Sequence, residues 1–152
     1  MNFPIEINTE SAVLTENLGQ ELAKVLTQNQ ELPKFIAMYG DLGVGKTSFV
    51  KGFCSEICKG AVVKSPTFAL VNEYKCCSGY KEKKVYHFDM YRISGEDDLY
   101  SIGYYDYLDD DCFCIAEWCE MIPFALPERY IKVSIDKLDF ENKRAIKISL
   151  VE

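Results

Sequence analysis

Eight consecutive residues, 40–47, have the types and spacing needed to bind a phosphate group. Their sequence, Gly-Asp-Leu-Gly-Val-Gly-Lys-Thr, fits the Walker A pattern Gly-x-x-x-x-Gly-Lys-[Ser/Thr]. Glycines allow successive backbone N–H groups to surround an anion, while Lys46 would supply positive charge to the β- and γ-phosphates and Thr47 a hydroxyl ligand to Mg²⁺. The segment therefore predicts a site for a nucleoside triphosphate with Mg²⁺. The contacts are expected from Asp41, Leu42, Gly43, Val44, Gly45, Lys46 and Thr47.

The residues on both sides of this loop favour a phosphate site over an ordinary glycine-rich turn. Residues 35–39 form a short apolar run, which predicts a buried strand. After the loop, Phe49, Val50 and Phe53 lie at helical spacing. A helix that begins at the loop points the positive end of its dipole toward a bound anion. The order strand, glycine-rich loop and helix is the setting that the motif requires.

Two acidic residues end apolar runs farther along the chain. Asp89 follows residues 85–88, and Glu117 follows residues 113–116. An ionised side chain beside a buried strand needs a partner, and a metal ion or its bound water is a suitable one. We therefore expect Asp89 and Glu117 to serve catalysis and to bind Mg²⁺ together with Thr47. The alternative for each acid is a surface position at a strand end.

Three further residues could contribute to such a site. Thr67 stands in a Ser-Pro-Thr-Phe segment and could sense the γ-phosphate or Mg²⁺, as switch loops do in nucleotide hydrolases. The alternative is a plain strand start that proline makes rigid. His87, the single histidine, shares a strand face with Asp89 and could support a ligand-binding side chain of the site rather than act as a base. Arg92 is close enough in sequence to contact phosphate or a partner chain.

The remaining pattern predicts a single P-loop ATPase domain over residues 1–152. Apolar runs and alternation predict strands at residues 3–7, 35–39, 62–74, 83–89, 112–116, 130–135 and 145–151. Helical spacing and capping residues predict helices at residues 11–28, from the glycine-rich loop to about residue 60, and from 94–97 through 102. These elements indicate an α/β, P-loop NTPase-like three-layer fold with a mixed central sheet.

The charge balance argues against several kinds of partner. The chain has 24 Asp and Glu residues against 17 Lys and Arg residues, a formal net charge of −7. Binding to a nucleic-acid backbone draws on clustered cations, so we expect no tight nucleic-acid binding by the chain alone. The sequence shows neither a basic segment followed by an apolar one at its start nor an apolar run of membrane-spanning length. We therefore expect a cytoplasmic protein without membrane contact.

Seven cysteines occur, without any Cys-x-x-Cys spacing. Cysteine packs well as a small apolar side chain, and the odd number argues against a complete set of disulfides. We expect the cysteines to fill the core. Cys76 and Cys77, next to a predicted turn, are the candidates for an exposed and reactive thiol.

The missing motifs favour ATP over GTP. A GTPase carries Asp-x-x-Gly and Asn-Lys-x-Asp, and neither occurs in the chain. A small-molecule kinase remains the alternative function, although an arginine-rich lid and a substrate pocket are not evident. A third class is a nucleotide-gated binding module whose ATP hydrolysis is incidental.

Several short motifs together resemble the bacterial TsaE (YjeE) P-loop ATPases. They occur in the order found in that family and extend over nearly the whole chain. Ala116 departs from the resemblance, because a larger aliphatic residue is usual before the acid. The matching segments are Leu18-Gly19, Gly40-Asp41-Leu42-Gly43-x-Gly45-Lys46-Thr47, Ser65-Pro66-Thr67-Phe68, Glu73-Tyr74, His87-Phe88-Asp89-x-Tyr91-Arg92, Gly103-x-x-x-Tyr107 and Glu117-Trp118.

The resemblance implies slow ATP hydrolysis that supports the TsaD–TsaB complex, which makes threonylcarbamoyladenosine in tRNA. It implies that Lys46 binds phosphate, that Thr47 and Glu117 hold Mg²⁺, and that Asp89 assists hydrolysis or metal binding. Thr67 would belong to a switch segment and Trp118 to the wall of the nucleotide site. Adenine contacts are implied around residues 9–12, where Ser11 is the expected ATP-binding residue.

Overall fold

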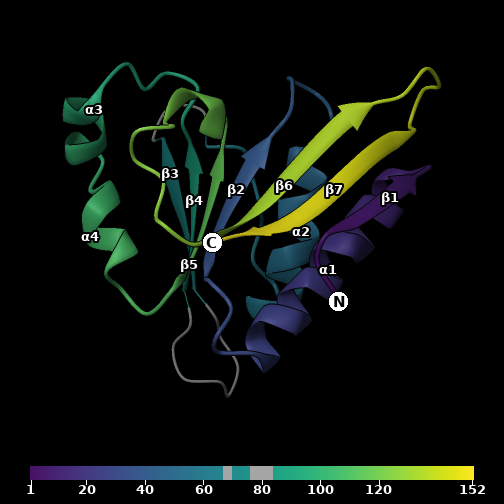
Figure 1. The fold of residues 1–152 in the computed structure, drawn as a ribbon, viewed down its shortest axis with the longest axis horizontal. Helices are drawn as coiled ribbons and strands as arrows, with labels where there is room; N and C mark the ends of the chain where they lie inside the picture. Colours follow the sequence, from purple (N-terminus) through teal and green to yellow (C-terminus); the bar gives the residue numbers. More distant parts are fainter. Residues whose placement is uncertain (67–69, 76–83) are drawn as a thin grey trace.

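The computed structural model describes residues 1–66, 70–75 and 84–152, and in these ranges the chain forms one seven-stranded sheet (Figure 1). The strand order is β1-β7-β6-β2-β5-β4-β3. The strands are β1 (Ile5–Thr9), β2 (Phe35–Tyr39), β3 (Val71–Lys75), β4 (Lys84–Asp89), β5 (Phe113–Glu117), β6 (Tyr130–Lys137) and β7 (Arg144–Val151). The helices are α1 (Ala12–Gln28), α2 (Lys46–Ile57), α3 (Glu96–Ser101), α4 (Tyr104–Leu108) and the 3₁₀ helix η1 (Cys119–Met121).

The sheet is mixed, as the sequence predicts. β2 pairs in parallel with β5 and β6, and β4 pairs in parallel with β5. The pairs β1–β7, β6–β7 and β3–β4 are antiparallel. Parallel strands direct their carboxyl ends to one edge of a sheet, and this edge is where ligands bind in such folds.

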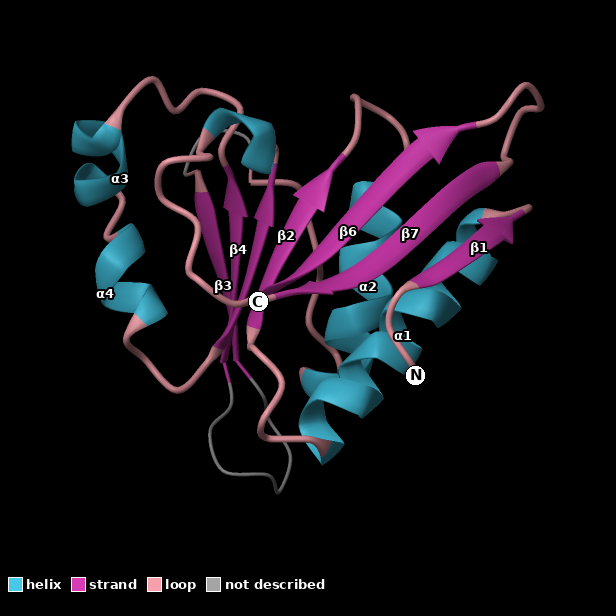
Figure 2. Cartoon of the chain, in the orientation of Figure 1, coloured by secondary structure: helices cyan, strands magenta, loops and turns pink. Residues whose placement is uncertain are grey.

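Helices cover both faces of the sheet and give it three layers (Figure 2). Ile36 and Met38 of β2 belong to the cluster that contains the buried residues of α1 and α2. Phe35 and Ala37 belong to the other cluster, which includes residues of α3 and α4. Successive side chains of a strand point to opposite faces, so the continuous apolar run of β2 reflects burial on both sides. The predicted three-layer α/β fold is confirmed.

The backbones of α1 and α2 touch through two glycines. A Cβ atom added to Gly52 would stand 1.8 Å from the carbonyl oxygen of Glu16, and one added to Gly19 would stand 2.2 Å from that of Phe49. Both distances are shorter than any real contact, so larger residues would push the helices apart. This close packing holds α2, which begins at Lys46, in a defined position against the sheet and α1.

Three sequence expectations need correction. Residues 61–66 are not a strand, and the predicted strand over 62–74 reduces to β3 at Val71–Lys75 within the described part of that range. The side chains of Asn72 and Tyr74, rather than a strand ladder, bind the backbone of Lys64. The helix predicted from 94–97 through 102 is α3, but the sequence did not predict the second helix, α4, which begins after Gly103 takes a left-handed φ of 74°.

The third correction concerns the start of α3. The expected capping box would pair Ser94 with Asp97, which is three residues on. Instead, the backbone N–H and the hydroxyl of Ser94 donate to Asp98, at 2.9 and 2.8 Å. Gly95 then occupies the N-cap position, and these two hydrogen bonds lower the pKa of the Asp98 carboxyl.

Two further expectations concern cysteines and membranes. Cys54, Cys58, Cys112, Cys114 and Cys119 are all buried, as predicted for side chains that fill the core. Cys76 and Cys77 lie outside the described residues. None of the helices in the described ranges has the length and apolarity needed to cross a membrane.

Candidate functional site

The glycine-rich loop connects the carboxyl end of β2 to the first residue of α2. Gly40, Gly43 and Gly45 have φ angles of 141°, 76° and 107°, a region that side-chain-bearing residues rarely adopt. Gly40 is also required for space, because an added Cβ atom would stand 2.4 Å from the carbonyl oxygen of Ile135. The glycines of the motif therefore fit the turn, as the sequence predicts.

Two contacts fix the middle of this loop. The Val44 side chain is buried, which anchors the loop in the core, while Asp41, Leu42 and Gly43 remain exposed. The Arg144 Nε donates to the carbonyl oxygen of Val44 at 2.7 Å. A loop held at its centre leaves its exposed residues available to an incoming ligand.

Lys46 is buried beside this loop. Its Nζ donates to the carbonyl oxygen of Gly40 at 2.5 Å and lies 3.8 Å from the centre of the Trp118 ring. Burial lowers the pKa of the Lys46 ammonium, and the nearby carboxylate of Glu117 acts in the opposite direction. The structure thus brings Lys46 together with Trp118, two residues named from the sequence as nucleotide contacts.

Asp89 and Glu117 lie side by side at the same sheet edge. They are register partners at the ends of the parallel strands β4 and β5. The Met90 N–H donates to the Glu117 carbonyl at 3.0 Å, and the Tyr91 N–H donates to Asp89 Oδ1 at 3.0 Å. Because β5 also neighbours β2, the two acids stand at the edge where the glycine-rich loop begins. Their roles toward Mg²⁺ and catalysis stay predictions.

Glu117 is almost fully buried, and His87 is its partner. The His87 Nε2 lies 2.6 Å from Glu117 Oε2, and Nδ1 lies 3.3 Å from the Tyr74 hydroxyl. The sequence suggested a supporting role for His87, and the structure shows that the side chain it contacts is Glu117. Tyr74 was not predicted to take part. Its place in the Glu73-Tyr74 segment of the resemblance was the available signal.

The remaining expected site residues lie at the starts of the two long helices. Thr47 is exposed in the first turn of α2. Ser11 caps α1, where its Oγ accepts the Leu14 N–H at 3.2 Å. A Cβ atom on Gly45 would lie 4.0 Å from the Thr15 methyl group, so the start of α1 adjoins the glycine-rich loop. Thr67 lies outside the described residues.

A cavity of about 380 Å³ opens next to the loop, between the end of β1 and the β6–β7 hairpin. Lys137, one of its residues, has its Nζ 3.8 Å from a Cβ atom built on Gly43. Sequence reasoning did not foresee the hairpin's contribution, because residues 137–143 resemble an ordinary charged turn. The lining residues are Asn8, Thr9, Glu10, Lys137, Leu138, Asp139, Phe140 and Lys143.

The donor atoms of the site suit Mg²⁺. Thr47, Asp89 and Glu117 offer hydroxyl and carboxylate oxygens, which are the ligands that this hard cation prefers. Across residues 1–66, 70–75 and 84–152, no group of three or more His, Cys, Asp or Glu side chains could enclose a metal ion. Mg²⁺ at nucleotide sites typically takes one or two carboxylates, with phosphates and water completing its coordination.

Comparisons with known proteins identify relatives over most of the chain. The family model described as "Threonylcarbamoyl adenosine biosynthesis protein TsaE" matches residues 9–146. The tRNA threonylcarbamoyladenosine biosynthesis protein TsaE of Haemophilus influenzae is 38% identical over 122 residues, which is 80% of this chain and 75% of that protein. The proteins of the same name from Rickettsia felis and Bacillus subtilis are 35% and 34% identical, over 88% and 67% of this chain and 75% and 61% of theirs.

A solved structure shares the fold. The crystal structure of YdiB from Bacillus subtilis aligns with a TM-score of 0.72 and 24% identity, covering 100% of this chain and 88% of that one. This similarity supports the three-layer α/β architecture. Because the family model spans residues 9–146 and the Haemophilus influenzae relative shares 38% identity over 80% of the chain, the chain belongs to the TsaE family of threonylcarbamoyl adenosine biosynthesis proteins.

Proposed function

We propose that this protein binds and slowly hydrolyses ATP, and that it thereby supports the TsaD–TsaB complex in the threonylcarbamoyladenosine modification of tRNA. The relatives are named for that biosynthesis. The observation that carries the ATPase proposal is the meeting of the glycine-rich loop, Lys46, Asp89 and Glu117 at one sheet edge. A phosphate cradle beside two carboxylates is the arrangement that nucleotide hydrolysis uses.

The phosphates would lie along residues 41–47. In this arrangement Lys46 exchanges the Gly40 carbonyl for the β- and γ-phosphate oxygens, and the Trp118 ring forms an adjacent wall. Thr47 and Glu117 would hold Mg²⁺, with Asp89 as a further ligand or as an aid to hydrolysis. When bound, Mg²⁺ offsets negative charge on the phosphate oxygens.

The base would occupy the cavity between the end of β1 and the β6–β7 hairpin. The cavity volume of about 380 Å³ suits the nucleoside part of ATP. Lys137 lines this cavity and also lies beside Gly43 of the phosphate loop. Phe140 supplies an apolar ring there, and Ser11 at the start of α1 is close in sequence to Thr9 and Glu10 of the lining. These positions agree with adenine contacts around residues 9–12.

The test separates the three kinds of function. ATP loss is measured with the chain alone, with TsaD and TsaB added, and with candidate small-molecule acceptors. We expect slow hydrolysis alone, a changed rate with the partners, and no dependence on an acceptor. Transfer of phosphate to an acceptor would establish a small-molecule kinase instead. Slow ATP loss that neither the partner proteins nor an acceptor changes would point to a nucleotide-gated binding module.

Co-purification supplies the second arm of this test. Tagged protein is mixed with TsaD and TsaB, with and without Mg²⁺-ATP, and with Lys46→Ala as the matched control. We expect a nucleotide-dependent complex with the unmodified chain and a weakened one with the variant. Absence of any complex under both conditions would contradict the proposed partners.

A further inference from the structure

Two buried side chains, His87 and Tyr74, connect the buried Glu117 carboxylate to the segment that follows α2. His87, Glu117 and Tyr74 have exposed fractions of 0%, 4% and 7%. His87 lies 2.6 Å from Glu117 and 3.3 Å from the Tyr74 hydroxyl. That hydroxyl lies 2.9 Å from the Lys64 carbonyl oxygen, and it accepts the Lys64 N–H at 3.2 Å. A continuous hydrogen-bonded path thus runs from the edge of the nucleotide site to residues 61–66.

Each of these groups needs the next one as a hydrogen-bond partner. A buried carboxylate is costly unless it is hydrogen-bonded, and the His87 Nε2–H supplies that bond to an ionised Glu117. A neutral imidazole has one N–H, so Nδ1 must then accept, and the Tyr74 hydroxyl is in place to donate. The hydroxyl has one proton and two acceptors, His87 Nδ1 and the Lys64 carbonyl. A displacement of Lys64 therefore changes what Tyr74 offers to His87.

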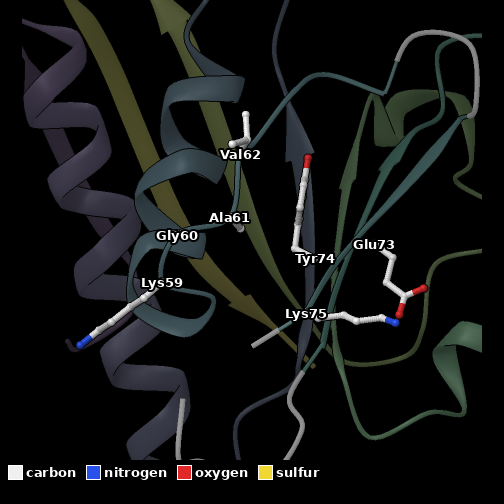
Figure 3. A pocket seen from close by; sticks show the side chains of 7 residues that line it. All are labelled: Lys59, Gly60, Ala61, Val62, Glu73, Tyr74 and Lys75. Carbon is white, nitrogen blue, oxygen red and sulfur yellow. The ribbon is translucent and has the colours of Figure 1, made fainter. Parts of the chain in front are cut away.

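The packing around Tyr74 leaves room for such a displacement. Tyr74 lines a cavity of about 440 Å³ between β3 and the end of α2, and Ala61 and Val62 lie on its other side (Figure 3). Val62 is 74% exposed. Ala61 and Val63 pack against the hydrophobic core, and the bonds from Tyr74 and Asn72 to Lys64 add to the contacts that hold this segment against β3.

We propose that His87 and Tyr74 are positioning residues that orient the Glu117 carboxylate for Mg²⁺-nucleotide and link its orientation to residues 61–66. The inference rests on the proposed nucleotide site and assigns a task to two buried polar residues that do not themselves contact the phosphates. Movement of residues 61–66 and binding of Mg²⁺-nucleotide are then energetically coupled.

The first experiment measures the affinity for a non-hydrolysable ATP analogue with and without Mg²⁺, and the ratio of the two affinities isolates the Mg²⁺ contribution. His87→Gln should lower this ratio about 10- to 100-fold, the usual effect of losing a group that orients a metal ligand. Tyr74→Phe should lower it about 3- to 10-fold, as expected for one hydrogen bond. The double variant should match His87→Gln alone, because both residues act through Glu117.

Tyr86→Phe is the matched control. Tyr86 precedes His87 on β4, faces the other side of the sheet and donates to Asp110 at 3.3 Å. The Tyr86→Phe variant should leave the ratio of the affinities with and without Mg²⁺ unchanged. If Tyr74→Phe and His87→Gln lower thermal stability but keep the wild-type ratio, the two residues are merely structural and the inference is overturned.

A second experiment uses cleavage by trypsin to measure how accessible residues 61–66 are. Lys59 and Lys64 are exposed, so trypsin can cleave after either one. Tyr74→Phe should speed this cleavage several-fold relative to Tyr86→Phe, and Mg²⁺ with the analogue should slow it in the wild type more than in His87→Gln. Equal cleavage in all variants would contradict the link.

A wild type that binds no nucleotide would overturn the proposed function itself, whereas wild-type binding with unaffected variants would overturn this inference alone.

Discussion

The ammonium group of Lys46 contacts two residues of the candidate nucleotide site, Gly40 and Trp118. It donates to the carbonyl oxygen of Gly40 and lies over the ring of Trp118, while burial lowers its pKa. Such a side chain is held near the position that phosphate would require, and a buried cation gains strongly from an incoming anion. Glu117 is held in a similar way by His87. Single-residue changes at these positions should therefore alter ligand binding more than folding.

Lys46→Ala should abolish ATP turnover and weaken nucleotide binding, with a loss of at least about 100-fold in rate. Because burial lowers the pKa of Lys46, the folded chain holds the charged form of this side chain at a cost, so its removal should not lower stability. Hydrolysis assays and circular dichroism measure the two effects. Lys51→Ala, an exposed lysine of the same helix, is the control. Undiminished hydrolysis in Lys46→Ala would refute the phosphate role.

The two acids should differ in effect. Glu117→Ala should chiefly weaken the Mg²⁺ dependence of binding, and it should destabilise the fold by about 1–3 kcal/mol because His87 loses its buried partner. Asp89→Ala should lower hydrolysis while nucleotide binding remains. Equilibrium binding of Mg²⁺-ATP and thermal unfolding decide between these effects, with the exposed Glu120→Ala as control. If neither variant changes binding or turnover, both acids are surface residues.

The element that sets the position of the phosphate loop is α2, through its contact with α1. Gly19 and Gly52 let the two backbones approach until a methyl group would overlap a carbonyl oxygen. The start of α1 in turn adjoins Gly45 through Thr15. Helix packing of this kind places the loop, the N-terminus of α2 and the N-terminus of α1 as one unit. The separation of the two helices is therefore expected to affect both stability and nucleotide affinity.

Gly52→Ala tests this role of helix packing. The added Cβ would meet the Glu16 carbonyl oxygen at 1.8 Å, so backbone must move, and we expect a loss of about 1–3 kcal/mol in the free energy of unfolding. Nucleotide affinity should fall as well, since Lys46 begins the same helix. Denaturant titration and equilibrium binding are the measurements. Gly95→Ala, where a Cβ meets nothing within 4 Å, should change both far less. Equal effects of the two variants would contradict the argument.

The whole molecule is acidic, with 24 Asp and Glu residues against 17 Lys and Arg residues. Some of its cations are already paired at the surface, among them Lys34 with Asp111 and Lys147 with Glu6. A field of this sign opposes approach to a phosphate backbone, whose binding is driven by cations that displace counterions. The proposed role therefore places the chain on the modifying proteins and leaves contact with tRNA to them.

The isolated protein should bind tRNA negligibly at physiological salt. A mobility-shift titration of the lone chain measures this, and the same titration with TsaD and TsaB present is the positive comparison. The acid excess is the physical reason, because a net negative charge opposes the approach of a phosphate backbone. Tight binding by the lone chain that weakens steeply as salt rises would contradict the prediction and indicate a direct role on RNA.

Local pattern by itself determined the loop at residues 40–47, the strand before it and the helix after it, because glycine spacing and apolar periodicity depend on near neighbours in the chain. The same holds for Asp89 and Glu117 as strand-ending acids. Other features depend on which strands pair, and the tertiary structure alone decided them. These include the bond between His87 and Glu117 and the path through Tyr74 to Lys64.

Two more features were decided by the tertiary structure alone. They are the position of the β6–β7 hairpin beside the loop and the glycine contact between α1 and α2. Lys137 stands far from Gly43 in sequence, and no local pattern marks their contact. The sheet order places β6 next to β2, and this neighbour relation brings the hairpin to the phosphate loop. Sequence determines residue types and local periodicity, whereas contacts between distant segments arise from the order and register of the strands.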